Sequence, residues 1–325
     1  MRIAIDRSNG HFAARQDTMT HGVFTQFSLT SDGARMVMDE GTFDHGVWAL
    51  PLADAVAGTF PDARRVVRAS ANVSGVISPD GSRLLVRRLL EVGSGHAEPR
   101  YSIMPYEGGA ETPFPAAGNI KRANWSDSQH VATATLGPGG LRLAEVDVQS
   151  GAQRNALQLP DSVVIDFAAL PNGWAWIPPK RDRIVVSEGG RRREFTPTKE
   201  LAGAFSLAVD RATRRVFYAG YARAADDSLG VGALTLDDGK TVLWTMHRAE
   251  DARVYAASAH AVVFAVANTQ DSWSLLGVDG PGAVTPLGTV GAPIIGGSLS
   301  RDLTRATFMQ MDYRADAWMN QVVVR

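Results

Sequence analysis

Short apolar stretches separated by polar turns recur along the whole chain. Each copy of the pattern joins an apolar stretch, a polar turn and a second β-rich stretch. The turn contains an aspartate or asparagine in every copy except that at 255–264, which keeps only the apolar–turn–apolar outline. The clearest copies lie at 27–38, 75–86, 123–134 and 297–308. Weaker copies lie at 167–174, 205–216 and 255–264. Helical periodicity is nearly absent, so the pattern predicts an all-β protein built from internal repeats.

The turn residues of these copies are regularly spaced. They are Asp32, Asp80, Asp127, Asn172, Asp210 and Asp302. The successive intervals are 48, 47, 45, 38 and 92 residues, and the last equals two periods of 46 with the copy at 255–264 between them. A period in the forties made of short strands is typical of a propeller with one four-stranded blade per repeat. Seven copies predict a seven-bladed β-propeller of four-stranded antiparallel blades, with blades beginning near residues 25, 73, 121, 163, 203, 253 and 294.

The second repeat shows how one blade is expected to be assembled. Strand a covers 75–78, and strand b follows from residue 83. Between them, Pro79 presets its φ angle and Gly81 is free to take a positive one, which favours a tight turn. The seventh copy ends after a strand at 317–324, so its outer strand is expected from the N-terminal residues 1–24. Such a closure removes an open sheet edge and makes residues 1–325 a single propeller domain.

Composition narrows the classes of function. The chain has 33 Lys and Arg against 34 Asp and Glu, which argues against a nucleic acid as the main partner. It has no cysteine, which excludes disulfides, thiolate metal sites and thiol nucleophiles. The start Met1–Arg7 lacks the apolar region of a signal peptide, and no apolar run reaches the roughly 20 residues that cross a bilayer. We therefore expect no membrane insertion by this segment, and a monomer.

Two segments of the sequence resemble a known family of repeats. The turn Ser78-Pro79-Asp80-Gly81 and the stretch 101–109 resemble the WD40-like, TolB-type propeller repeat, also called the PD40 repeat. More narrowly, the strand at 318–324 is similar to those in propeller regions attached to some bacterial serine/threonine protein kinases. The resemblance implies a sensing or binding role and assigns no catalytic residue. It implies a periplasmic location if the chain belongs to a membrane-anchored kinase, and a cytoplasmic one otherwise.

The sequence contains no clear catalytic motif. No Gly-x-Ser-x-Gly elbow of a serine hydrolase occurs, and 296–300 lacks the final glycine. Asp161, Asp166 and Glu200 are candidate carboxylates for glycoside chemistry, but such residues more often cap loops. The basic run 191–193 is placed on an outer strand, where charge protects an edge from pairing.

The tryptophans suggest either sugar stacking or core packing. Trp125, Trp174, Trp176 and Trp318 fall on or beside predicted strands. Large aromatic side chains at such positions usually fill the space between blades. We therefore predict a packing role for them.

Three histidines suggest a possible metal site. His21 precedes the first strand a, while His45 and His96 are placed in the b–c loops of the first two blades. These loops open on one face of a propeller, and with Asp44 nearby they offer ligands for a divalent metal. The alternative is three exposed loop histidines without a ligand. Their spacing matches no compact metal motif, so we predict no metal and no cofactor.

These observations together predict a non-catalytic binding, sensing or protein-interaction module. Its partner is a protein, or a small-molecule or carbohydrate ligand, at the mouth of the central channel on the face of the d–a and b–c loops. The predicted ligand-binding residues are His21, His45, His96, Lys121, Arg122 and Asp166. Lys121 and Arg122 would attract an anionic group. The alternative function is a metal-assisted polysaccharide lyase or glycoside hydrolase acting on the same face.

Overall fold

The computed structural model divides the chain into two compact units, and most of the second is described in detail. The units are Met1–His45 with Met311–Arg325, and Gly46–Gln310. The described residues are 2–5, 12–17, 24–29, 35–51, 63–69, 73–92, 96–116, 118–224, 228–249, 251–256, 262–269, 272–290, 295–302 and 304–321. Among them, no helix has the length and apolar character needed to cross a membrane.

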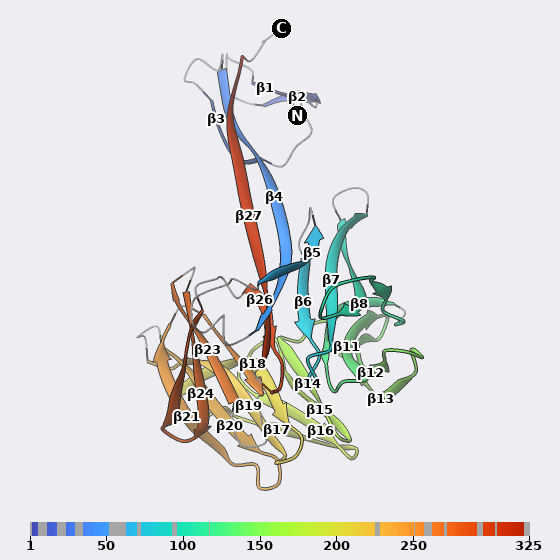
Figure 1. Cartoon of the computed structure of the whole chain (residues 1–325), viewed down its shortest axis with the longest axis vertical. Coiled ribbons are helices and arrows are strands. Elements are labelled where there is room, and N and C mark those ends of the chain that lie inside the picture. Colours follow the sequence, from blue (N-terminus) through green and yellow to red (C-terminus); the bar gives the residue numbers. More distant parts are fainter. Residues whose placement is uncertain are drawn as a thin grey trace. The chain divides into compact units, whose positions relative to one another are not determined.

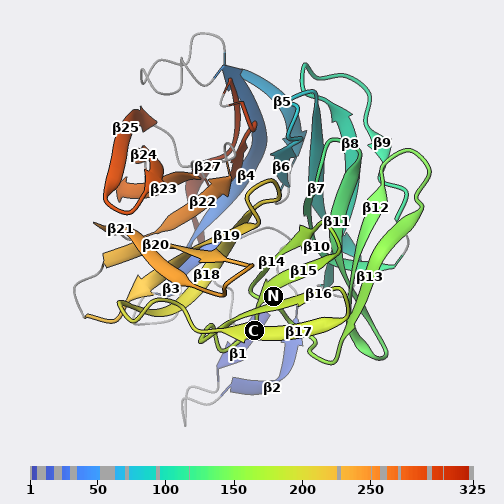
Figure 2. The ribbon, with the colours of Figure 1, turned by 90° about the horizontal axis from the view of Figure 1, so that it is seen from below.

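Antiparallel sheets arranged as blades around a common axis make up the unit Gly46–Gln310 (Figures 1 and 2). Blade I contains β6 (Val73–Ile77), β7 (Arg83–Val92), β8 (His96–Pro105) and β9 (Thr112–Pro113). Blade II contains β10 (Asn119–Trp125), β11 (His130–Gly137), β12 (Gly140–Asp147) and β13 (Gln153–Leu159). Blade III contains β14 (Asp166–Leu170), β15 (Gly173–Ile177), β16 (Ile184–Glu188) and β17 (Arg191–Phe195).

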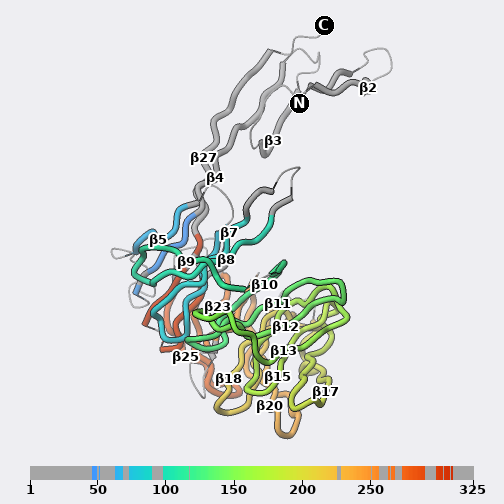
Figure 3. Tube along the Cα trace, turned by 90° about the vertical axis from the view of Figure 1, so that its right-hand side faces the viewer, coloured from blue at the N-terminus to red at the C-terminus, as the bar shows by residue number. Residues whose placement is uncertain are grey.

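The remaining blades continue in sequence order around the ring, as the colours of Figure 2 show, and Figure 3 shows the same Cα trace from the side. Blade IV contains β18 (Leu201–Asp210), β19 (Arg215–Ala222), β20 (Ser228–Thr235) and β21 (Thr241–Arg248). Blade V contains β22 (Ala252–Ala256), β23 (Val262–Thr269), β24 (Ser272–Gly280) and β25 (Ala283–Val290). In blades I to V each strand pairs with the next one along the chain, and the first strand of each blade faces the ring axis.

Blade VI joins the two ends of the chain and corrects the predicted blade number. It contains β26 (Ile295–Leu299), β27 (Arg305–Gln321), β4 (Arg35–Pro51) and β5 (Arg64–Ala69), in that order. The first and seventh sequence copies therefore belong to one sheet, in which the strands are ordered β26, β27, β4 and β3 (Phe24–Leu29). The described residues form a six-bladed propeller, and the prediction of seven blades was wrong.

The N-terminal strands take a different place from the one predicted. β1 (Arg2–Ile5) and β2 (Phe12–Asp17) pair as a separate two-stranded sheet in the unit of the chain ends. The strands from the N-terminal part that complete blade VI are β4 and β5, rather than a strand from residues 1–24. β4 and β27 contribute residues to both units.

The a–b turns have the geometry that their sequence predicts. In blade I the Ser78 hydroxyl donates to Asp80 Oδ1 at 2.6 Å, and Asp80 accepts the backbone N–H of Ser82 at 3.2 Å. Gly81 has a φ of 73°, the left-handed value that glycine adopts without strain. Blade VI repeats the arrangement, with the Ser300 hydroxyl donating to Asp302 at 2.7 Å.

The hydrophobic core consists of clusters that lie between neighbouring blades. One cluster joins Trp125 and Val131 of blade II to Leu85 of blade I. Another joins Ala306 of blade VI to Trp273 of blade V. Packing between sheets rather than within one sheet is what makes the inner positions apolar on both faces. Trp125, Trp174 and Trp176 are buried, which confirms their predicted packing role.

Hydrogen bonds across more than two hundred residues tie blade VI to blade I. The backbone N–H of Ile77 donates to Ser298 Oγ at 2.7 Å, and the Thr307 hydroxyl donates to the Gly75 carbonyl at 2.9 Å. Arg305 donates to the Gly81 carbonyl at 2.6 Å. The buried polar groups at this junction are thus paired, as buried groups must be.

Candidate binding site at the channel mouth

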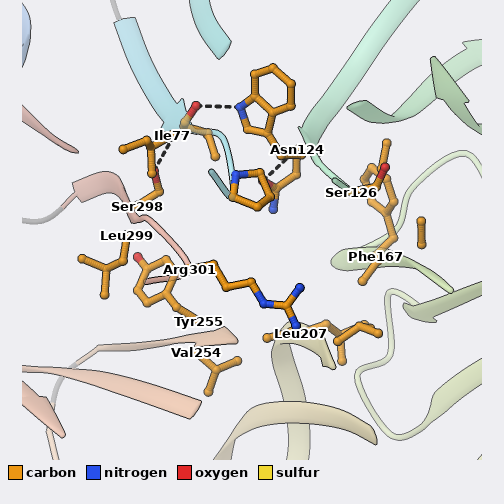
Figure 4. Close-up of a pocket in the computed structure, with 18 of the residues that line it drawn as sticks. Ile77, Asn124, Ser126, Phe167, Leu207, Val254, Tyr255, Ser298, Leu299 and Arg301 are labelled. Atoms are coloured by element: carbon orange, nitrogen blue, oxygen red, sulfur yellow. Dashed lines mark hydrogen bonds between the residues drawn. The ribbon is translucent and has the colours of Figure 1, made fainter. Parts of the chain in front are cut away.

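A cavity of about 250 Å³ occupies the axis of the propeller (Figure 4). All the inner strands, β6, β10, β14, β18, β22 and β26, contribute to its wall. Pro79, Ser126, Arg211 and Arg301 also line it, and each of them follows the end of an inner strand. The cavity therefore lies toward the a–b turns, at the end of the axis opposite to the d–a loops.

Most of the residues in its wall are apolar, and polar groups come from several blades. Phe167, Leu207, Val254 and Leu299 supply apolar surface. The Trp125 indole N–H is occupied, because it donates to the Val76 carbonyl at 2.9 Å. An apolar cavity with a small number of polar groups is the usual form of a small-molecule site.

Tyr255 contributes a phenol group to the wall. Burial raises the pKa of Tyr255 to about 12, so its hydroxyl stays neutral across the physiological range. A neutral phenol can both donate and accept a hydrogen bond.

Arg211 is held by a network of buried and partly buried groups. Its Nη2 lies 2.8 Å from Glu145 Oε1, and its Nε donates to the Ala169 carbonyl at 3.3 Å. Glu145 is only 2% exposed and also pairs with Arg154 at 3.3 Å. Burial alone would raise the pKa of Glu145, but hydrogen bonds from Arg211 and Ser126 outweigh it, and the pKa lies below its usual 4.5. Arg211 therefore links blade IV to blade II through a carboxylate that stays ionised.

Arg301 reaches across the mouth with few contacts. Its side chain extends from the end of β26 over the cavity, as Figure 4 shows. Its Nη2 lies 3.8 Å from Asp210 Oδ1, at the end of β18, so it spans past the intervening strand β22. The side chain is 52% exposed, which leaves it open to a ligand.

The predicted site residues are only partly described. His21 lies outside the described residues. His45 lies within β4 and His96 begins β8, rather than loops, and the described part of the structure does not include their side chains. Within that part, no group of histidines and carboxylates is suited to hold a metal ion. Lys121 and Arg122 are exposed on β10, and Asp166 begins β14.

Arg122 and Asp166 come together from neighbouring blades. Arg122 Nη1 lies 3.8 Å from Asp166 Oδ1 and donates to the Ile165 carbonyl. Asp166 Oδ2 accepts the backbone N–H of Leu207 at 2.8 Å. Burial raises the pKa of Asp166 above its usual 3.8, despite the Leu207 hydrogen bond and the charge of Arg122. The pair lies toward the starts of the inner strands, away from the a–b turns, and its predicted role in binding stays a prediction.

The raised pKa of Asp166 gives a pH dependence that can be measured. A carboxyl group whose pKa is higher in the folded state binds its proton more tightly there, so its contribution to stability falls as pH rises through and above 3.8. We expect the melting temperature of Asp166→Asn, relative to the parent chain, to rise between pH 4 and pH 7.

Asp302→Asn is the matched control for this measurement. Hydrogen bonds from Ser300 and Thr304 lower the pKa of Asp302, so its stabilising effect is present above 3.8 and is lost as pH falls. The stability of Asp302→Asn relative to the parent chain should therefore fall as pH rises toward 3.8, and should change little between pH 4 and pH 7. Equal slopes for the two variants would contradict the assignment.

Sequence reasoning missed Arg211, Arg301 and Tyr255. Arg211 and Arg301 stand directly after a strand-end polar residue, Asp210 and Ser300, at the place where blade I has Pro79. An arginine at that turn position could have indicated a binding residue, because the a–b turns surround the channel mouth. Tyr255 lies in the most degenerate sequence copy and gave no signal of its own.

Comparison with solved structures identifies the fold. A putative TolB from Agrobacterium tumefaciens superposes with a TM-score of 0.56 at 13% identity, covering 83% of this chain and 99% of that one. The fold is that of a β-propeller. A chain of a nidogen/laminin complex gives a TM-score of 0.53 at 12% identity, covering 83% and 98%. TolB from Acinetobacter baumannii gives 0.47 at 10% identity, covering 86% and 64%. No protein-family model and no curated protein matches the sequence.

Proposed function

We propose that this chain is a non-catalytic binding module that takes its ligand in the axial cavity, through the mouth at the a–b turns. The observation that carries the proposal is the cavity itself, whose wall is built by the inner strands of every described blade. A site supported on strands of a closed ring is held rigidly, because buried hydrophobic clusters join neighbouring blades, as between blades I and II and between blades V and VI. Rigid concave sites of this kind bind ligands with little loss of conformational entropy.

The fold neighbours agree with a binding role without specifying it. A propeller scaffold hosts many unrelated functions, so the site rather than the fold must carry the argument. The nidogen/laminin structure is a complex of proteins, which is consistent with propellers as interaction modules. The alternative of a metal-assisted lyase or glycoside hydrolase depends on His21, His45 and His96, and it stays a prediction.

Blocking the cavity tests the proposal. Ala168 lines the wall on β14, and tryptophan at this position would fill much of the space. We expect saturation-transfer NMR with a general fragment library to find compounds that bind the parent chain and lose binding to Ala168→Trp. Ala110→Trp, at an exposed turn position, adds the same side chain outside the cavity and is expected to keep those signals. Binding that is equal in all three proteins, or absent from the parent chain, would overturn the proposal.

A further inference from the structure

The two arginines of the cavity differ in how they are bound. Arg211 has a short ion pair to Glu145 at 2.8 Å, a second to Asp127 at 3.7 Å and a hydrogen bond to a backbone carbonyl. Arg301 has one ion pair among the described residues, to Asp210 at 3.8 Å. Asp210 is fully buried and already accepts the N–H of Ala212 at 3.0 Å and the Thr213 hydroxyl. Both carboxylate oxygens of Asp210 therefore keep a hydrogen bond when Arg301 turns toward a ligand.

The charged side chains of the cavity wall are arginines. Arg211 and Arg301 line the cavity, and among the described residues no carboxylate lines it, because their carboxylate partners are not part of the wall. The aspartates of the surrounding turns accept hydrogen bonds from their own turns, as Asp80 does from Ser78 and Asp302 from Ser300. An anion entering the cavity thus meets a guanidinium without meeting an inward-facing carboxylate.

The size and the apolar walls limit what kind of anion fits. One water occupies about 30 Å³ of liquid, so a cavity of about 250 Å³ corresponds to about eight waters. A polyanion would need more than one available cation, whereas a single guanidinium matches one carboxylate through paired N–H donors. The apolar surface from Phe167, Leu207 and Val254 suits a compact hydrocarbon or aromatic body.

We infer that the cavity binds a monocarboxylate with a compact apolar body, and that Arg301 is the residue that binds the carboxylate. This inference rests on the proposed function, because it names the ligand class of the same site. Asn124 and Tyr255 line the cavity as neutral polar groups beside the path of Arg301 (Figure 4). Charge-assisted hydrogen bonds are roughly twice as strong as hydrogen bonds between neutral groups, so removing the guanidinium should weaken binding of a carboxylate measurably.

Two isosteric probes test the inference on the full chain. 3-Phenylpropionate carries the carboxylate, and 3-phenylpropanamide has the same shape without the charge. By calorimetric titration we expect the acid to bind the parent chain at least about tenfold more tightly than the amide. Arg301→Met should remove that preference, Arg301→Lys should keep part of it, and Arg142→Met, at an exposed position of β12, should leave it unchanged.

The outcomes separate this inference from the proposed function. Equal affinity of acid and amide, with both lost in Ala168→Trp, would overturn the role of Arg301 and leave the cavity as a binding site. Unchanged acid binding in Arg301→Met would do the same. Tighter binding of phenyl phosphate than of the acid would overturn the monocarboxylate class. If neither acid nor amide binds the parent chain, the inference fails, and the fragment experiment then decides the proposed function independently.

Discussion

Replacing Glu145 with alanine is expected to lower the free energy of unfolding by about 3 kcal/mol, as removal of one partner from a buried ion pair does. Glu145 is 2% exposed and joins Arg211 of blade IV to Arg154 and Asn155 of blade II. Without it, the guanidinium of Arg211 keeps only Asp127, at 3.7 Å, as an ion-pair partner among the described residues. We expect the loss in free energy of unfolding to lie at the low end of the usual range, because the Arg211 side chain is 26% exposed and can be hydrated by solvent.

Glu194→Ala is the matched control for this substitution. Glu194 also pairs with two arginines, Arg183 at 3.3 Å and Arg192 at 3.1 Å, but its side chain is 47% exposed. Exposed pairs of this kind contribute about 0–1 kcal/mol, so its loss should be small. Urea unfolding followed by circular dichroism measures both values, and similar losses for the two variants would show that the Glu145 network does not hold the blades together.

The effect of Glu145→Ala on stability is also expected to depend on pH. The pKa of Glu145 is lowered in the folded protein, so its stabilising effect is present above its usual pKa of 4.5 and is lost as pH falls through the lowered value. The difference in stability between the parent chain and Glu145→Ala should therefore shrink in acid. A difference that grows in acid would contradict the assigned ionised state.

Much of the fold could be predicted from the sequence because each blade is locally encoded. The turn at Ser78–Gly81 and the strands on either side of it occur as predicted. The blade number could not be predicted, because the copies at 27–38 and 297–308 have the same local pattern as the others. Whether two such copies form two blades or share one depends on which strands pair across the ring, and periodicity carries no information about that pairing.

The site was harder to predict than the fold. Lys121, Arg122 and Asp166 are predicted from their place at the channel mouth on the face of the d–a and b–c loops, and the structure pairs Arg122 with Asp166. The cavity itself lies at the other ends of these strands, where residues such as Phe167 and Val254 have the same apolar character as the core. Only the ring places them around an open space, so their part in the cavity wall depends on contacts between blades that are distant in sequence.

The second large effect is expected from removing Trp174, which packs between blades II and III. Replacing Trp174 with alanine is expected to cost about 3–5 kcal/mol, the usual range for a large aromatic side chain removed from a core. Trp174 is 1% exposed in the cluster between blades II and III, with its ring centroid 6.0 Å from that of Phe167. Its indole N–H donates to the Asn155 carbonyl of blade II at 2.6 Å, so the substitution also removes a hydrogen bond between blades.

Trp174→Phe separates the hydrogen bond of Trp174 from its packing, and Tyr221→Ala serves as a control at an exposed aromatic residue. Trp174→Phe keeps most of the apolar volume but leaves the Asn155 carbonyl without its donor, at an expected cost of about 1–3 kcal/mol. Tyr221→Ala removes an aromatic side chain that is 44% exposed, and should cost less than about 1 kcal/mol. Denaturant midpoints of the three variants give this order directly. A loss for Trp174→Ala no greater than for Tyr221→Ala would mean that the indole does not join blades II and III, and would reopen a ligand-stacking role for it.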